Sequence, residues 1–315
     1  RYWRDWSSDV CSSDLGLKRP SQDAILPRLV NHEDLPSASA LMSIRWQIAG
    51  VIGPSLGGLL VATYGAGSGY LFNCIAFILS LSLLWRVSPV PPLSQSTPPS
   101  FASLMEGVRY AVGRKDLLGT YIVDLAAMFL AMPMALFPFW ADEIGAPWAL
   151  GLFYSSITIG AVLVTLVSGW VRDYPHHGRA IVFGALGWGF AIMAAGATTS
   201  LPIVIGCLIL AGALDQISAL FRGFIWNQSI PDELRGRLAG IEMLSYLLGP
   251  LGGQARAGGM AAMSSLRTSV VGGGLLCVLA VGAVASSMPK FRKYDVRTNE
   301  FAVEQAKIRK IRENS

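Results

Sequence analysis

The sequence predicts an all-α integral membrane protein, and three observations on the 315-residue chain support this fold class. Hydrophobic residues make up 52% of the chain and charged residues only 14%, against roughly 25% charged residues in an ordinary soluble domain. Apolar runs as long as a membrane is thick recur along the chain. Lys and Arg punctuate these runs instead of forming one basic patch, so the net charge of +5 does not indicate nucleic acid as a partner.

Eight segments have the length of a membrane span, because a helix needs about 20 mostly apolar residues to cross a hydrocarbon core about 30 Å thick. They are Leu35–Thr63, Gly69–Trp85, Leu117–Trp140, Trp148–Val171, Ala180–Ala197, Leu201–Phe224, Leu238–Gly258 and Thr268–Met288. A Pro/Ser stretch at 89–99 separates the first two from the last six. Apolar residues then recur at helical spacing from Phe101 to Val112, which predicts a cytoplasmic connector with an amphipathic surface helix.

Connections rich in Lys and Arg alternate with connections that contain neither. The basic ones precede the first span and follow the second, fourth, sixth and eighth, whereas 65–68, 141–147 and 198–200 carry no Lys or Arg. Because short cytoplasmic loops carry the positive excess, the basic connections and the C-terminus are predicted to lie in the cytoplasm. Only Arg256 and Arg267 depart from this pattern, both near the last outer turn.

These features divide the chain into five parts. Residues 1–15, with a near-tandem Ser-Ser-Asp run and no apolar period, are interpreted as a non-native, adapter-like segment, with a functional amino-terminal arm as the alternative. Residues 16–87 are interpreted as two spans of an N-terminal bundle and 88–116 as the connector. Residues 117–288 are expected to form a six-helix C-terminal bundle, and 289–315 a basic cytoplasmic tail.

Three local motifs carry a family resemblance. Gly50, Gly53, Pro54, Gly57 and Gly58 match the pattern Gly-x-x-Gly-Pro-x-x-Gly-Gly. With the Arg-Pro pair at 19–20 and the segment 231–237 (Pro-Asp-Glu-Leu-Arg-Gly-Arg), this motif makes the chain resemble the major facilitator superfamily from about residue 16 onward. Within it, the chain is similar to the bacterial group of enterobactin-exporter-like efflux proteins.

The resemblance implies a partial major facilitator fold. That fold has twelve helices in two six-helix bundles, so about eight transmembrane helices in a two-plus-six arrangement correspond to helices five to twelve. We therefore expect a chain truncated at its amino terminus, and the functional expectations concern the full-length parent.

The glycine motif is the first candidate site, because the resemblance places it in the fifth helix of proton-coupled exporters. Its glycines would let a neighbouring backbone approach closely, and Pro54 removes one amide donor and bends the helix. Pro133 and Pro138 would permit similar bending in the third span. A gating role and simple helix packing both remain open for these residues.

A second candidate is a cytoplasmic latch. Gly169, Asp173, Gly178 and Arg179 resemble a degenerate copy of the superfamily loop Gly-x-x-x-Asp-x-x-Gly-Arg-Arg, with altered spacing and without the second Arg. Its alternative is a solvated basic turn. The connection between the tenth and eleventh helices contributes further latch candidates, Asp232, Arg235 and Arg237.

Charged residues inside the predicted spans are a third group, since each costs on the order of 2.5 to 3.5 kcal/mol to insert. Asp124 and Asp215 are candidates for proton coupling, with a packing role as the alternative for each. Arg45 could pair with an anionic substrate or with a carboxylate of other helices. Arg222 and Glu242 are close enough to the span ends to extend to the surface.

Aromatic residues gather at the outer edge of the third and fourth spans: Phe137, Phe139, Trp140 and Trp148. They are expected to form an interfacial belt, with a stacking surface for an aromatic substrate as the alternative.

Taken together, these features favour a secondary active transporter of the bacterial inner membrane. We expect a monomer that exports a small molecule, such as a siderophore or drug-like compound, in exchange for protons. The alternative is a non-transporting truncated fragment or membrane scaffold. An enzyme is disfavoured because no nucleophile–base pair, His-Glu-x-x-His motif or phosphate-binding loop occurs. The four Cys and three His residues have no metal-ligand spacing, so neither a metal nor a cofactor is expected.

Overall fold

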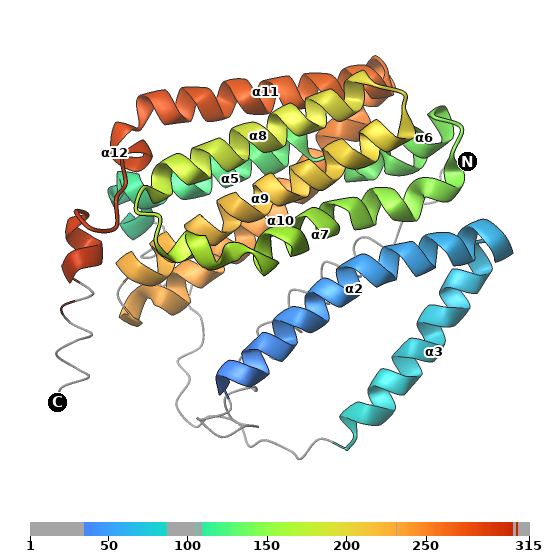
Figure 1. Cartoon of the computed structure of the whole chain (residues 1–315), viewed down its shortest axis with the longest axis horizontal. Coiled ribbons are helices and arrows are strands. Elements are labelled where there is room, and N and C mark those ends of the chain that lie inside the picture. The colour runs from blue at the N-terminus through green and yellow to red at the C-terminus, as the bar shows by residue number, and fades with distance from the viewer. Residues whose placement is uncertain (1–34, 87–104, 106–108, 231, 305–306, 308–315) are drawn as a thin grey trace. The chain divides into compact units, whose positions relative to one another are not determined.

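The computed structural model describes residues 35–86, 105, 109–230, 232–304 and 307, and all regular structure within these ranges is helical (Figure 1). The predicted all-α class is therefore confirmed. The chain divides into two compact units. The first holds Arg1–Gly53 and Leu60–Pro98, and the second holds Pro54–Leu59 and Pro99–Ser315.

The first unit contains most of α2 (Leu35–Tyr64) and all of α3 (Ala66–Leu84). A single residue, Gly65, separates the two helices and has φ of 81°, a left-handed value that glycine adopts without strain. The Ser68 hydroxyl donates to the carbonyl of Leu60 at 3.0 Å and to that of Gly65 at 2.7 Å. These bonds satisfy carbonyl groups at the end of α2, so the two helices form a tight hairpin.

The second unit is a helical bundle. Its longer helices are α5 (Lys115–Ala131), α7 (Leu150–Leu166), α8 (His177–Ala197), α9 (Leu201–Ser229), α10 (Asp232–Met263) and α11 (Leu266–Ser287). Short helices join or extend them: η2 (Met134–Leu136), α6 (Phe137–Glu143), η3 (Pro147–Ala149), η4 (Ser168–Arg172) and α12 (Pro289–Arg292). Within the bundle α8 packs between α9 and α11, α7 lies against α9, and α5 lies against α10 and α11 (Figure 1).

Six helices of the described chain are long and apolar enough to cross a membrane. They are Ala66–Leu83, Lys115–Glu143, Pro147–Leu166, His177–Ala197, Leu201–Trp226 and Leu266–Ser287. Helices α2 and α10 stand at the other two predicted positions, with 30 and 32 residues. They are not among the six, and the apolar stretch found in α2 is the shorter Ile48–Val61. Their crossing of the membrane stays a prediction.

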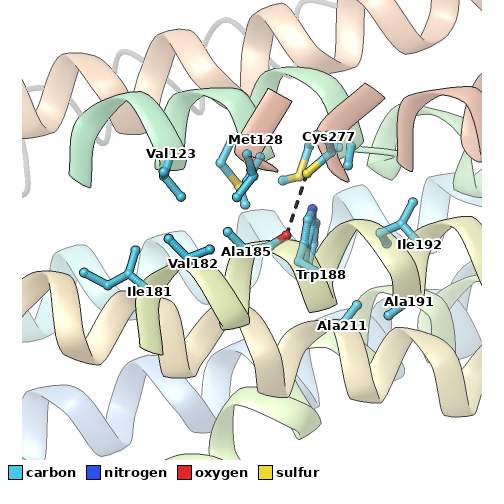
Figure 2. Close-up of a cluster of buried hydrophobic side chains, with 14 of the residues drawn as sticks. Val123, Met128, Ile181, Val182, Ala185, Trp188, Ala191, Ile192, Ala211 and Cys277 are labelled. Carbon is cyan, nitrogen blue, oxygen red and sulfur yellow. Dashed lines mark hydrogen bonds between the residues drawn. The ribbon is translucent and has the colours of Figure 1, made fainter. Parts of the chain in front are cut away.

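The bundle core consists of apolar side chains between α5, α8, α9 and α11. Trp188 of α8 is 2% exposed and is among the largest buried side chains, and the thiol of Cys277 lies 3.8 Å from the Ala185 carbonyl (Figure 2). Cys277 is therefore a small buried apolar group, as expected from its position in an apolar run.

The predicted third span, Leu117–Trp140, is interrupted. α5 ends at Ala131, and Met132 has φ −94° and ψ 102°, the extended conformation that a residue before proline prefers. Pro133 and η2 follow, and the chain continues into α6 with Pro138 in its first turn. Pro133 therefore breaks the span, whereas Pro138 stands where proline fits a helix.

The segment after α11 is packed against the bundle and is not a free tail up to residue 304. Phe291 and Tyr294 are buried. The backbone N–H of Gly178 donates to the Tyr294 carbonyl at 3.4 Å, and that of Val296 donates to the Pro175 carbonyl at 3.2 Å. Residues 289–304, called the C-terminal clamp below, thus pair with the loop before α8.

The expected amphipathic helix at 101–112 lies partly outside the described residues. Residue 105 and residues 109–113 are helical, which agrees with the prediction over that range. The adapter-like segment 1–15 and the Arg-Pro motif at 19–20 lie outside the described residues entirely.

Candidate functional site

An ion pair lies inside the second unit, at membrane depth. Arg222 Nη1 of α9 is 2.6 Å from Asp124 Oδ1 of α5, and each side chain is only 3% exposed. Both residues belong to helices of membrane-spanning length. An isolated charge would be costly here, so the pair exists because each group compensates the other.

Two hydroxyl groups complete the contacts of the pair. Ser245 of α10 donates to Asp124 Oδ2 at 3.3 Å, and the hydroxyl of Ser218, one turn before Arg222, accepts from Arg222 Nη1 at 3.2 Å. Within the described chain, Arg222 Nε is buried and has no hydrogen-bond partner. The guanidinium is therefore only partly satisfied, which is rare for a buried arginine.

The prediction that Arg222 extends to the surface is wrong. Its side chain stays inside the bundle because a carboxylate lies on the facing helix at a contact distance. At 2.6 Å and away from water, the charge-assisted hydrogen bond to Asp124 compensates part of the hydration that the guanidinium gives up. Asp124 likewise lies inside the bundle, since the residue is 2% exposed.

Asp215 lies on the same helix as Arg222, seven residues earlier, and is partly buried. Seven residues are close to two helical turns, so Asp215, Ser218 and Arg222 share one face of α9. Arg222 and Asp124 are both near enough to act on Asp215 electrostatically. The three charged groups comprise one cation and two carboxylates.

A second buried ion pair lies at the start of α5. Arg114 contacts Asp116 through Nε at 3.2 Å and Nη2 at 2.5 Å, and Arg114 Nη1 donates to the Ser229 carbonyl at 2.7 Å. The Tyr110 hydroxyl accepts from Arg114 at 3.1 Å, and the guanidinium carbon lies 3.7 Å from the centre of the Phe301 ring. This pair ties the clamp to the ends of α5 and α9.

The electrostatics of this second pair are those of a fixed structural group. Burial disfavours the charge of Arg114, but the hydrogen bonds and the charge of Asp116 outweigh burial and raise the pKa of Arg114 above its ordinary value. Burial, with a smaller effect of the Asp116 carboxylate, raises the pKa of the nearby Tyr294 to about 12. Both groups therefore keep one protonation state across physiological pH.

The glycine motif lies in the middle of α2. Gly50 and Gly53 fall in the first unit, and Pro54, Gly57 and Gly58 in the second. Within the second unit, a Cβ on Gly58 would lie 2.8 Å from the Gly151 backbone, so a side chain there would need α7 to move. Close backbone approach, as expected, occurs at Gly58, but not at Gly57, where a Cβ would meet nothing within 4 Å. The gating role stays a prediction.

The latch candidates are spread over two regions. Asp173 and Arg179 are exposed, Gly169 lies in η4, and Gly178 is buried beneath the clamp. Within the described part of the chain neither Asp173 nor Arg179 forms an ion pair, whereas His176 Nδ1 lies 3.1 Å from Asp295 Oδ2. The backbones of Asp232, Arg235 and Arg237 begin α10, but their side chains lie outside what the structure describes. The latch stays a prediction.

Arg45 is exposed on α2 and belongs to the first unit, whereas the charged groups of α5 and α9 belong to the second.

The four aromatic residues predicted to form an interfacial belt fall into two pairs. Phe139 and Trp148 are 66% and 60% exposed, as a belt requires, but Phe137 and Trp140 are buried against Phe153, with ring centroids 5.6 and 5.7 Å away. The prediction of an interfacial belt is thus wrong for Phe137 and Trp140.

The contacts of Arg222, Ser218 and Ser245 around Asp124 were not predicted from sequence. One signal was available: Asp215, Ser218 and Arg222 recur at intervals of three and four residues in a mostly apolar helix, which predicts a polar stripe. Ser245 could not be identified in this way, because hydroxyl groups in α10 have no such pattern.

The helical fold and the six helices of membrane-spanning length define an all-α multi-pass membrane protein, and the family match places it in the major facilitator type. The chain belongs to the transmembrane secretion effector family, which matches residues 10–310. It is 28% identical over 258 residues to the enterobactin exporter EntS of Shigella boydii serotype 18, covering 81% of this chain and 62% of that protein. It is 30% identical over 283 residues to EntS of Salmonella typhi, covering 86% and 66%. The chain thus spans a little under two thirds of the length of these relatives.

Proposed function

We propose that the protein is a secondary exporter of the bacterial inner membrane that moves a siderophore-like small molecule out of the cytoplasm in exchange for protons. The buried pair Asp124–Arg222 with Asp215 on the same face of α9 is the observation that carries the proposal. Family membership and the similarity to enterobactin exporters support transport and the substrate class.

The argument for protons begins with charge balance. One arginine and two carboxylates leave a net charge of −1 in a water-poor bundle, and binding one proton makes the set neutral. With the proton on Asp215, Arg222 would pair with Asp124, and the distance of 2.6 Å between these two side chains supports that pairing. A proton on Asp124 would free Arg222 to turn toward Asp215. The set can therefore hold one proton in two alternative arrangements.

The sparse hydrogen bonding of Arg222 makes such an exchange inexpensive. Only Nη1 is engaged among the described contacts, and a weak 3.3 Å bond from Ser245 is the other contact of Asp124. An exchange therefore breaks few bonds, while a proton-coupled transporter needs a carboxylate whose proton affinity changes during the cycle. In this proposal the protein works as a monomer without metal or cofactor.

The test is efflux of enterobactin from proteoliposomes with an imposed pH gradient. Asp124→Asn and Asp215→Asn keep the shape and remove the titration, and each is expected to abolish the dependence of efflux on the gradient. Asp142→Asn, at an exposed residue at the end of α6, is the matched control and should leave efflux unchanged. Full gradient-driven efflux in both variants would exclude antiport through these groups.

Two further outcomes separate the alternatives. Pro54→Ala restores an amide donor in α2 and is expected to slow efflux several-fold while leaving enterobactin binding unchanged. Absence of any efflux from correctly folded protein, with or without the gradient, would instead favour a non-transporting scaffold.

A further inference from the structure

The break between α5 and α6 leaves a backbone carbonyl without its helical donor. In an uninterrupted helix the Phe129 carbonyl would accept from the N–H of residue 133, four positions later. Residue 133 is proline and has no N–H. An unpaired carbonyl within a membrane-spanning segment costs several kcal/mol, so another donor is required.

Arg256 of α10 supplies that donor. Its Nε donates to the Phe129 carbonyl at 3.2 Å, and Nη1 contacts the sulfur of Met260 at 3.5 Å. Helix α11 leaves room for this side chain, because a Cβ on Gly273 would lie 2.7 Å from Arg256 Nη2 and 2.5 Å from the Leu130 carbonyl. The guanidinium therefore fits between three helices at the break.

A second donor holds the other side of the break. The Tyr154 hydroxyl of α7 donates to the Met134 carbonyl at 3.1 Å. Its ring also lies 5.0 Å from that of Phe137, the first residue of α6. The direction of α6 is thus fixed from α10 on one side and from α7 on the other.

Arg267, the other exception to the charge pattern, offers a comparison. Its Nε and Nη2 each donate at 3.2 Å, to the carbonyls of Gly196 and Ala197 at the end of α8. Cations are favoured at such C-terminal carbonyls. Both arginines therefore donate to carbonyls in the last turn of a helix, but only the end of α5 has a proline, Pro133, at the position whose N–H would otherwise donate to Phe129.

We propose that Arg256 is a positioning residue: by donating to the Phe129 carbonyl in place of residue 133, it sets the angle at which α6 leaves α5. Phe137 of α6 packs against the rings of Phe153 and Tyr154, so a change in this angle would also shift α7. The effect on transport rests on the proposed function, but the hydrogen-bond replacement does not.

A double-mutant cycle tests the replacement in the purified protein. Arg256→Met should lower Tm by about 2–4 °C when Pro133 is present, the shift expected for one lost hydrogen bond in a chain of this size. Pro133→Ala restores a backbone N–H that can donate to Phe129, so in that background Arg256→Met should lower Tm by less than half as much. Arg267→Met is the matched control and should cause the same shift in both backgrounds. Equal shifts for Arg256→Met in the two backgrounds would overturn the proposal.

A second measurement does not depend on the folding of the Pro133 variant. Amide hydrogen exchange of Arg256→Met should rise at residues 134–143 and stay unchanged at 190–197, with the reverse for Arg267→Met. Arg256→Lys, which retains one donor, should restore part of the protection. Unchanged exchange at 134–143 in Arg256→Met would contradict the positioning role.

For transport, Arg256→Met is expected to reduce kcat for enterobactin efflux several-fold with little change in KM, because the proposal assigns this residue to positioning helices and not to substrate binding. A change confined to KM would argue against this. If the wild-type protein shows no efflux, the proposed function fails, while the cycle and the exchange experiment still decide the role of Arg256.

Discussion

The two buried ion pairs of the bundle both use a carboxylate of α5, yet their surroundings differ. Arg114 donates four hydrogen bonds, two to Asp116 and one each to Tyr110 and Ser229, and it lies on the Phe301 ring. Asp116 also accepts from Asn299 at 3.4 Å. Arg222 donates only through Nη1 among the described contacts, to Asp124 and Ser218.

Under the proposed function, this difference separates a structural pair from a pair that changes partners during transport. Removing a proton or a partner from a fully bonded network leaves many groups unsatisfied, so the pair at the start of α5 holds one arrangement. Among the described residues, the Asp124–Arg222 pair has fewer bonds to lose. It also has a second carboxylate, Asp215, on the face of α9 that carries Arg222. Buried charge alone therefore does not mark a functional group. In this proposal, the number of satisfied hydrogen-bond donors around a buried charge separates a structural group from a functional one.

Asp116→Asn should have the largest effect on stability. It leaves the buried Arg114 without an anion, because Asp116 is the only carboxylate that Arg114 contacts among the described residues. We expect a loss of about 3–5 kcal/mol in the free energy of unfolding, measured by denaturation in detergent. Asp173→Asn, at an exposed position, should change it by less than about 0.5 kcal/mol. A loss below about 1 kcal/mol for Asp116→Asn would remove the distinction between the two pairs.

Tyr294 reports on the same network through pH. Its pKa is raised from 10.0 in the unfolded chain to about 12 by burial and, to a smaller extent, by Asp116. The folded state therefore holds this proton more tightly. Its contribution to stability is complete below pH 10 and is lost as pH rises toward 12, by roughly 2–3 kcal/mol. Urea denaturation at about pH 9 and about pH 11.5 should show this loss in the wild type and a smaller loss in Tyr294→Phe; identical losses would contradict it.

Asp124→Asn is the matched substitution in the pair at membrane depth, and we expect a smaller loss of about 1–3 kcal/mol. The variant still has Asp215 on the face of α9 that carries Arg222, so the Arg222 guanidinium retains a carboxylate to compensate its charge. Adding Asp215→Asn removes that compensation, and the loss should then exceed the sum of the two single losses. Additive losses in the double variant would show that Asp215 does not replace Asp124 as the partner of Arg222.

The positions of the helices could largely be predicted from sequence, because apolar run length and charge alternation have a direct physical cause in the membrane. The predicted segment Ala180–Ala197 coincides with α8, which spans His177–Ala197. The break after Ala131 was predicted only as bending at Pro133. Whether a proline bends or ends a helix depends on what can satisfy the freed carbonyl, and that donor, Arg256, is 127 positions away from Phe129.

The site could be predicted only in part. The cost of burying a charge identifies Asp124 and Asp215 from sequence. The position of Arg222 along its own helix, near the end of the span, instead predicts a side chain at the surface. Its actual position depends on a facing carboxylate, which sequence does not place. The sequence of the C-terminal clamp predicts a basic tail. Its packing could not be predicted, since Phe291 and Tyr294 are buried by residues far away in the sequence, among them Gly119 and Gly178 for Phe291.

Phe301→Leu should have the smallest effect, and it isolates the cation–π contact of the structural pair. Leucine keeps an apolar side chain in the clamp but offers no ring face to the Arg114 guanidinium, which lies 3.7 Å from the ring centre. We expect a loss of about 0.5–1 kcal/mol, because Phe301 is 39% exposed and water weakens the attraction. In Asp116→Asn the guanidinium has lost its anion and depends more on the ring, so the same substitution should cost more there. Phe139→Leu, at a residue that is 66% exposed, is the control and should have the same effect in both backgrounds. If Phe301→Leu costs the same with and without the Asp116 carboxylate, the ring and the carboxylate act independently on Arg114, and the pair at the start of α5 is not the single network described here.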